Sequence, residues 1–408
     1  MSLFDDFTTS ARQQGPSPEA ARPDPAGALR PLNEDTWGRM QRDYQQGRVK
    51  GETTHVTQLD EHFTWMPGYC NVWTGWPGDG KTEFLYQLLL LRAVFKRRKS
   101  AIFSPENMPE EQIYDQLIHA LTGQNPDRSW QSCLPPNRYL LAKEFIREHF
   151  VVVYPGKGMG RTPQHLLSYF EAAIVKYGVS HCLLDPWNKV DHSAMNALGG
   201  YEPYLIHVLG QLTDWTVDTK QSLTITAHPK RLDGMRHGQA RPIPDGTSIS
   251  GGQTWENMAH VIGTVYRPYK HYPRTDPLFR AVAIYLHKVK SHKLVGFPGS
   301  LGEGSERSDV AIDFDWQQAR YLFNGVSPLA CRTAESFTSP PPSSTPTTPR
   351  RPAARPYLLP TSFPLTTGTP TVAPSPCLLR EKALPQGPPR RHALPARRRR
   401  CPLLYRGR

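Results

Sequence analysis

Cysteine clusters and long apolar runs are both missing from this sequence. Its six cysteines are scattered, and no pair has the Cys-x-x-Cys spacing of a zinc ribbon or a redox motif. No signal-peptide pattern precedes them, so we expect reduced thiols in an intracellular protein. The longest apolar stretch, around Leu88–Leu91, is much shorter than the roughly 20 residues that a membrane helix needs. We therefore expect a soluble protein with no membrane role.

Acidic residues are nearly absent from the end of the chain. Residues 331–408 contain 14 Lys or Arg, 2 acidic residues and 17 of the 41 prolines, which leaves 35 basic and 34 acidic residues for 1–330. Such a segment cannot bury enough apolar surface to offset the entropy of its chain. We therefore predict a Pro/Arg-rich disordered tail over 328–408, and the net charge of +13 says little about the folded part.

The role of the predicted tail stays open. Its run Arg397–Arg400 fits a nucleic-acid contact or a localisation signal, but equally a solvated segment without function. A gene extended out of frame would produce the same composition.

The rest of the pattern predicts a flexible leader over 1–30 and one folded domain over 31–327. Short apolar runs alternate there with amphipathic stretches, which is typical of a mostly parallel α/β sheet flanked by helices. The predicted parallel strands are 71–74, 101–104, 150–154, 181–185, 222–227 and 261–266. The predicted helices are 81–95, 109–122, 163–177, 202–219 and 255–260. The segments 281–290 and 309–323 are expected to close the sheet as antiparallel strands.

A glycine-rich segment of eight residues connects the first predicted strand to the first predicted helix. It reads Gly-Trp-Pro-Gly-Asp-Gly-Lys-Thr, begins at Gly75 and contains Gly78 and Gly80. Backbone N–H groups of such a loop bind phosphate oxygens, Lys81 reaches the β and γ phosphates, and the hydroxyl of Thr82 binds Mg²⁺. The flanking strand and helix favour this interpretation over an ordinary glycine turn. The segment therefore predicts a nucleoside triphosphatase that uses ATP and Mg²⁺.

Polar residues follow three other predicted strands, whose carboxyl ends border one crevice. Asp185 ends a buried strand and is the predicted Mg²⁺ ligand, with a turn-forming Asp as the alternative. Glu106 lies just past the second strand and is the candidate catalytic base, although an acidic residue also suits the N-terminus of the helix opened by Pro109. His228 follows the strand 222–227 and is the candidate γ-phosphate sensor, although a lone histidine is more often structural.

Basic residues follow the candidate sensor directly. They include Lys230, Arg231 and Arg236. A change of contact at His228 on loss of the γ-phosphate would therefore pass straight into a basic loop.

These segments, in this order, resemble the ring-shaped replicative DNA helicases of the DnaB and Twinkle type, whose motor is a RecA-like P-loop NTPase domain. The segments are Gly75–Thr82, Ser104–Asn107, Asp185–Asn188 and His228–Lys230, and Ser248–Gly252 resembles the family's next motif. The likeness covers roughly residues 50–323. It implies the roles given above for the nucleotide site, and it implies that Lys230, Arg231 and Arg236 contact the backbone of single-stranded DNA.

The chain departs from this family in several places. The family has Lys-x-Arg on a late strand, with an arginine that reaches a neighbour's nucleotide, and here the segment reads Lys288-Val289-Lys290. Lys290 keeps the charge of that catalytic group but loses the planar fork of a guanidinium. His260 stands where the family's pattern has an acidic residue. Inside the glycine loop, Trp76 and Pro77 either stiffen the loop or contact a base.

The resemblance predicts an ATP-driven translocase on single-stranded DNA, working as a homohexamer that unwinds duplex at replication forks. The alternative is a RecA-like recombination or regulatory ATPase that binds DNA without unwinding it. A truncated or frameshifted copy that folds but does not assemble is a third interpretation. We expect no primase half in this chain, a primase on a separate chain as a partner, and a cytoplasmic, nucleoid-associated location in a bacterium or for a phage-encoded protein.

Overall fold

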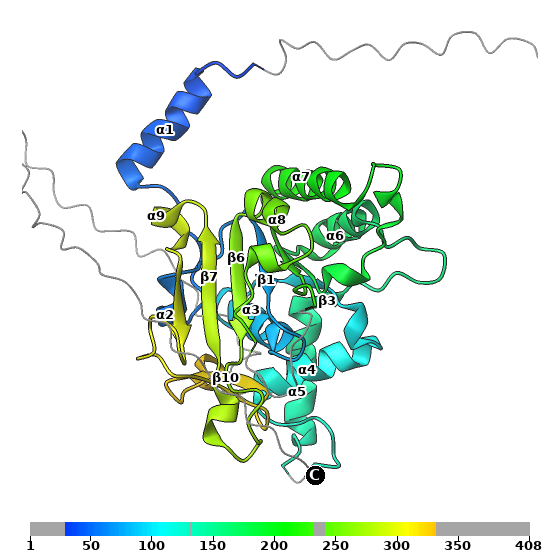
Figure 1. The fold of residues 1–408 in the computed structure, drawn as a ribbon, viewed down its shortest axis with the longest axis vertical. Helices are drawn as coiled ribbons and strands as arrows, with labels where there is room; N and C mark the ends of the chain where they lie inside the picture. The colour runs from blue at the N-terminus through cyan, green and yellow to red at the C-terminus, as the bar shows by residue number, and fades with distance from the viewer. Residues whose placement is uncertain (1–28, 131, 232–240, 332–408) are drawn as a thin grey trace, which may run out of the picture. The chain divides into compact units, whose positions relative to one another are not determined.

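An eight-stranded sheet forms the centre of the structure. The computed structural model describes residues 29–130, 132–231 and 241–331, so the predicted tail from residue 332 and the predicted leader up to residue 28 lie outside the described residues. All described residues belong to one compact unit. The strands are ordered β3-β2-β4-β5-β1-β6-β7-β8 across the sheet (Figure 1). The glycine-rich segment therefore starts from a strand, β1, that is flanked on both sides.

The strands from β3 to β6 in this order are parallel, and β7 and β8 are antiparallel to their neighbours. Their bounds are β1 Cys70–Thr74, β2 Ser100–Phe103, β3 Phe150–Val152, β4 His181–Leu184, β5 Ser222–Thr226, β6 Val261–Tyr266, β7 Ala283–Val289 and β8 Gly299–Gly302. This architecture confirms the predicted mostly parallel α/β sheet with closing antiparallel strands.

Helices cover both faces of the sheet, and neighbouring strand residues face opposite layers. In β1, Val72 packs in the layer that holds α6, α7 and α8, whereas Trp73 packs in the layer that holds α3, α4 and α5 (Figure 1). The helices are α1 Glu34–Gln46, α2 Thr57–Asp60, α3 Lys81–Lys96, α4 Glu110–Thr122, α5 Pro136–His149, α6 Pro163–Tyr177, α7 Tyr201–Thr219, α8 Gly252–Met258 and α9 His292–Val295. Burial on both faces explains why β1 and β5 have no exposed residue.

Helix ends follow the expected capping chemistry. The side chain of Thr162 accepts a hydrogen bond from the backbone of His165 at the start of α6, and Gly178 ends that helix in the left-handed conformation. Gly123 ends α4 in the same way. These caps account for helix bounds that lie close to the predicted ones.

One predicted strand was wrong. The segment 309–323 does not close the main sheet, because β9 Ile312–Asp315 and β10 Arg320–Phe323 pair with each other in a separate two-stranded sheet. The last strand of the main sheet is instead β8, whose Gly-Ser-Leu-Gly sequence lacks the β-branched residues that mark a strand. Helices α1 and α5 were also not predicted.

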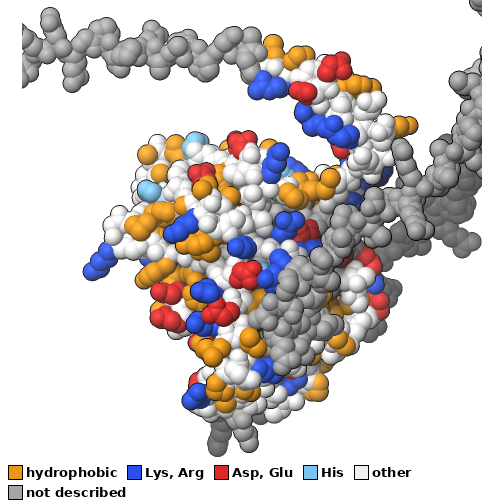
Figure 2. Space-filling model, turned by 180° about the vertical axis from the view of Figure 1, so that it is seen from behind, with side chains coloured by type: hydrophobic (Ala, Val, Ile, Leu, Met, Phe, Trp, Pro, Cys, Tyr) orange, Lys and Arg blue, Asp and Glu red, His pale blue; other side chains and the backbone are white. Residues whose placement is uncertain are grey.

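The described part of the chain contains no helix that is both long and apolar enough to cross a bilayer. On the face shown in Figure 2, acidic, basic and hydrophobic side chains are mixed, without one large basic area among the coloured residues. This mixture fits the near balance of 35 basic and 34 acidic residues in 1–330.

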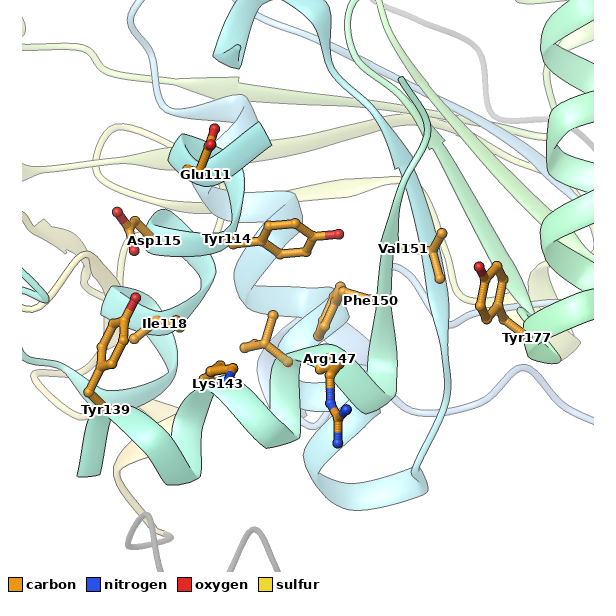
Figure 3. A pocket seen from close by; sticks show the side chains of 11 residues that line it. Glu111, Tyr114, Asp115, Ile118, Tyr139, Lys143, Arg147, Phe150, Val151 and Tyr177 are labelled. Carbon is orange, nitrogen blue, oxygen red and sulfur yellow. The ribbon is translucent and has the colours of Figure 1, made fainter. Parts of the chain in front are cut away.

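A cavity of about 660 Å³ lies between α4, α5 and β3 (Figure 3). Its wall combines the rings of Tyr114, Tyr139 and Phe150 with the charged groups of Asp115 and Lys143. Because β3 is the edge strand furthest from β8 and three strands separate it from β1, the cavity is distant from the glycine-rich segment. It is therefore not part of the candidate site described next.

Candidate nucleotide-binding site

The glycine-rich segment forms a tight loop between the end of β1 and the start of α3. Gly75 and Gly80 have φ values of 147° and 88°, which L-residues with a side chain rarely adopt. A Cβ atom at Gly75 would lie 2.3 Å from the carbonyl oxygen of Val265, and one at Gly80 would lie 2.1 Å from the hydroxyl of Tyr321. The loop thus needs glycine at both positions, and it brings backbone N–H groups to the N-terminus of a 16-residue helix.

Lys81 is buried within this loop, with 6% of its surface exposed. Its Nζ donates hydrogen bonds to the carbonyl oxygens of Gly75 at 2.9 Å and Trp76 at 3.3 Å. Burial lowers the pKa of the ammonium group, and the charges of Asp79 and Asp185 oppose that shift. A positive charge is therefore held inside the loop by groups that an incoming phosphate can replace.

Asp185 is a meeting point of three hydroxyl groups from different strands. Its Oδ2 accepts hydrogen bonds from Thr82 at 2.9 Å and Ser104 at 3.2 Å, and its Oδ1 accepts one from Thr226 at 2.5 Å. Asp185 follows β4, Ser104 follows β2 and Thr226 ends β5, so the carboxyl ends of parallel strands converge as expected. The structure thus brings the predicted ligands Thr82 and Asp185 together.

Thr226 was missed as a candidate site residue. Its only sequence signal was its position, because it is the last residue of β5 and precedes the candidate sensor His228 by two residues. Ser104 had appeared only as part of a motif. Both hydroxyls orient the carboxylate toward the loop.

Glu106 and His228 lie together at the same edge of the sheet. The distance from Oε2 of Glu106 to Nε2 of His228 is 3.9 Å, and Nζ of Lys189 lies 3.8 Å from Oε1 of the same carboxylate. Burial lowers the pKa of His228, and the charge of Lys81 lowers it further, while Glu106 raises it. The imidazole is therefore neutral near pH 7. Lys189 was not predicted as a neighbour of the candidate base.

Trp76 packs into the structure with 6% of its surface exposed. Its Nε1 donates a 2.9 Å hydrogen bond to the carbonyl oxygen of Pro242, and the guanidinium of Arg241 lies 5.2 Å from the ring centroid. The sequence left open whether this ring stiffens the loop or contacts a base, and these contacts tie the ring to its own chain. Trp76 therefore anchors the glycine loop to residues 241–242.

The predicted DNA-contacting residues lie after β5. Lys230 and Arg231 are exposed, and the backbone of Lys230 donates a 2.8 Å hydrogen bond to Ser248. Arg236 lies outside the described residues. The segment from His228 onward thus leads from the candidate nucleotide site into exposed basic side chains.

Lys290 is remote from the glycine loop of its own chain. It is exposed, and its backbone N–H donates to the carbonyl oxygen of His260, just before β6 begins. The glycine loop follows Thr74, which pairs with Thr264 well along the parallel strand β6. Lys290 and the loop therefore lie at opposite edges of the sheet, so contact with a nucleotide requires a second copy of the chain.

The available donors fit a magnesium ion held jointly with a nucleotide. Mg²⁺ in such sites takes one or two protein ligands and completes its shell with phosphate oxygens and water. The hydroxyl of Thr82 and the carboxylate of Asp185, 2.9 Å apart, are oxygen donors of this kind. No cluster of three or more His, Cys, Asp or Glu that could hold a metal occurs among the described residues, which agrees with a metal that enters with its nucleotide.

The fold and the loop define a class, the RecA-like ATPase domains. One solved ATPase domain of a DnaB-like helicase has a TM-score of 0.54 and 14% sequence identity to this chain, covering 70% of this chain and 96% of that domain. A DnaB-like replicative helicase, solved in a study of its interactions with primase, has a TM-score of 0.53 and 14% identity over 72% of this chain and 67% of that one. The chain therefore has the RecA-like fold of DnaB-like helicase ATPase domains, as the resemblance predicted.

Sequence similarity points to the same group. The Twinkle homolog protein, chloroplastic/mitochondrial, of Arabidopsis thaliana is 23% identical over 223 residues. These residues are 53% of this chain and 30% of that protein, so the similarity spans less than a third of the relative's length. No protein-family model matches the sequence.

Proposed function

We propose that this chain is an ATP-dependent translocase on single-stranded DNA that acts as a hexameric helicase at replication forks. The observation that carries the proposal is the convergence of Thr82, Asp185 and Lys81 at the glycine loop, with Glu106 and His228 on the same sheet edge. The RecA-like fold and the similarity to a Twinkle homolog support this choice among the many uses of a phosphate-binding loop.

The residues divide the chemistry of hydrolysis among them. Loop N–H groups and the ammonium of Lys81 bind the β and γ phosphates, and Thr82 and Asp185 hold the Mg²⁺ that accompanies ATP. The bound ion neutralises charge on the phosphate oxygens. Glu106 orients the attacking water and accepts its proton, because its carboxylate is the acidic group beside the neutral imidazole of His228. His228 then donates a hydrogen bond to the γ-phosphate.

Force on DNA would come from the segment that follows the sensor. Lys230 and Arg231 are exposed two and three residues after His228, so a shift at the sensor moves them directly. Contacts from such side chains to phosphates give affinity without sequence preference, as a translocating motor requires. Lys290 would act on the nucleotide of a neighbouring subunit, which makes assembly part of the active site. A primase on a separate chain is the proposed partner, because the DnaB-like helicase of similar fold interacts with primase.

A forked duplex with one labelled strand tests the proposal. We expect the full chain with ATP and Mg²⁺ to release the labelled strand, and Lys81→Ala to release none. DNA-stimulated hydrolysis without strand release would favour the alternative, a recombination or regulatory ATPase. Absence of any ATP hydrolysis by the wild-type chain would contradict both functions.

Assembly is tested separately. We expect the mass of the protein with ATP and single-stranded DNA to be that of a hexamer, both for the full chain and for a variant lacking residues 328–408. A monomer under these conditions would contradict the ring, and a hexamer only with the tail would give the tail a role in assembly.

A further inference from the structure

Asp79 places a carboxylate inside a loop that is proposed to bind an anion. The side chain is 2% exposed, its Oδ2 accepts a 3.2 Å hydrogen bond from the backbone of Trp76, and its own N–H donates to the carbonyl of Trp76 at 3.0 Å. These bonds hold the turn between residues 76 and 79 closed. They also fix a negative charge beside the N–H groups that would bind phosphate, where its field opposes a nucleoside triphosphate.

Lys270 compensates this charge from outside the loop. Its Nζ lies 3.1 Å from Oδ1 of Asp79 and also donates a hydrogen bond to the carbonyl oxygen of Pro77. The lysine lies so closely over the turn that a Cβ atom at Gly78 would be 2.9 Å from its Nζ. Lys270 comes from the segment that follows β6, so this contact joins two parts of the chain that the sheet brings side by side.

The other ammonium group of the site is already engaged. Nζ of Lys81 donates to the carbonyl oxygens of Gly75 and Trp76 rather than to Asp79. Burial raises the pKa of Asp79, and the largest opposing influence is the charge of Lys270, ahead of that of Lys81. The ionised carboxylate therefore depends mainly on Lys270.

We propose that Lys270 is a positioning residue for nucleotide binding that acts through Asp79. It neutralises the buried carboxylate and holds the turn at Pro77, so that the loop presents N–H groups and the charge of Lys81 to the triphosphate without opposition. This inference rests on the proposed binding of ATP at the loop. It deepens that proposal by adding an ion pair that the phosphate-binding motif itself does not contain.

An electrostatic role and a merely structural one predict different effects of removing the carboxylate. In Lys270→Met the charge of Asp79 is left uncompensated in a buried position next to the phosphates. In Asp79→Asn the amide oxygen can still accept the hydrogen bond from Trp76, while the negative charge is gone. Combining both changes removes the repulsion but leaves Lys270 absent.

The test is a calorimetric titration of the full chain with ATP and Mg²⁺. We expect Lys270→Met to raise the dissociation constant about tenfold, and Lys270→Arg and Asp79→Asn to bind at least nearly as well as the wild type. The double variant Asp79→Asn/Lys270→Met is expected to recover wild-type affinity. Lys293→Met, at an exposed lysine in α9, is the matched control, with thermal unfolding followed for every variant.

Two results would overturn the inference. One is wild-type affinity in Lys270→Met, and the other is a double variant that binds as weakly as Lys270→Met alone. If Lys270→Met does not fold, weakened binding in Asp79→Asn decides against the inference by itself. No binding of ATP by the wild-type chain would instead reject the proposed function, and the inference with it.

Discussion

The hydroxyl group of Thr82 donates a 2.9 Å hydrogen bond to Oδ2 of Asp185, which lies 103 residues later in the chain. Ser104 and Thr226 hold the same carboxylate, which is 4% exposed. Three hydroxyl groups therefore fix Asp185 beside the start of α3 without any ligand. A metal ion that enters with a nucleotide would find its carboxylate ligand already oriented.

Asp185→Asn should weaken the use of magnesium while preserving this arrangement. The amide oxygen can still accept hydrogen bonds from the hydroxyls, but the charge that attracts Mg²⁺ is lost. We expect turnover to fall and the Mg²⁺ concentration for half-maximal ATP hydrolysis to rise about tenfold or more. Asp191→Asn, at an exposed aspartate of the same connection, is the control. An unchanged magnesium dependence would remove Asp185 from the metal site.

Glu106→Gln should separate binding from hydrolysis. The glutamine keeps the size of the side chain beside His228 and Lys189 but cannot accept a proton from water. We expect ATP affinity close to that of the wild type and a hydrolysis rate lower by about 10²-fold or more. Single-turnover phosphate release measures the rate. Turnover near the wild-type value would mean that another group is the base.

Local sequence signals were enough for the loop and its neighbours. The glycines at 75 and 80 are required by backbone conformation and close contacts, so their spacing identified the turn, and β1 and α3 begin and end within one residue of the predicted bounds. The resemblance added Glu106 and His228 through the order of motifs. Their roles stay predictions until the variants are measured.

The missed features depend on pairing across long stretches of chain. The hydrogen bond between Thr226 and Asp185 spans 41 residues, and the one between Lys270 and Asp79 spans 191. No periodic pattern indicates such partners. The same limitation explains the incorrect strand at 309–323, because its apolar alternation is satisfied by a hairpin with itself and the sequence does not indicate which strand it joins.

His260 should make the folded state sensitive to acid. Its Nδ1 accepts a 3.1 Å hydrogen bond from the backbone of Cys70, and burial, followed by the charges of Lys290 and Lys288, lowers its pKa from 6.5 to about 4. Below pH 6.5 the unfolded chain binds a proton that the folded chain refuses until about pH 4. This contribution to stability is therefore complete above pH 6.5 and is lost as the pH falls toward 4.

Comparison of His260→Asn with the wild type isolates this effect. Asparagine keeps an acceptor for the Cys70 N–H but does not titrate. Between about pH 7 and about pH 5 we expect the free energy of unfolding to fall by about 1 kcal/mol more in the wild type than in the variant, after allowance for solvent screening. Urea denaturation at both pH values measures the difference. Equal acid sensitivity of the two proteins would show that His260 takes up its proton in the folded state.

The basic residues after the sensor should set the salt dependence of DNA binding. Lys230 and Arg231 are exposed, and each phosphate contact with single-stranded DNA contributes about −0.7 to the slope of log K against log salt. We expect Lys230→Ala/Arg231→Ala to weaken binding and to reduce that slope by about 1.4. Lys143→Ala/Arg147→Ala, which removes two exposed cations from α5, is the control. A slope unchanged by the first pair would place the DNA site elsewhere.

Lys290 provides a test of assembly, because it lies at the sheet edge opposite to the loop of its own chain. If it acts on a neighbour's nucleotide, Lys290→Ala should bind ATP normally but hydrolyse it at least about tenfold more slowly, and Lys290→Arg should remain active. Mixing Lys290→Ala with Lys81→Ala should restore part of the activity, because some interfaces then combine an intact loop with an intact Lys290. Steady-state hydrolysis in the mixture measures this, and a rate equal to the mean of the two separate variants would rule out action across the interface.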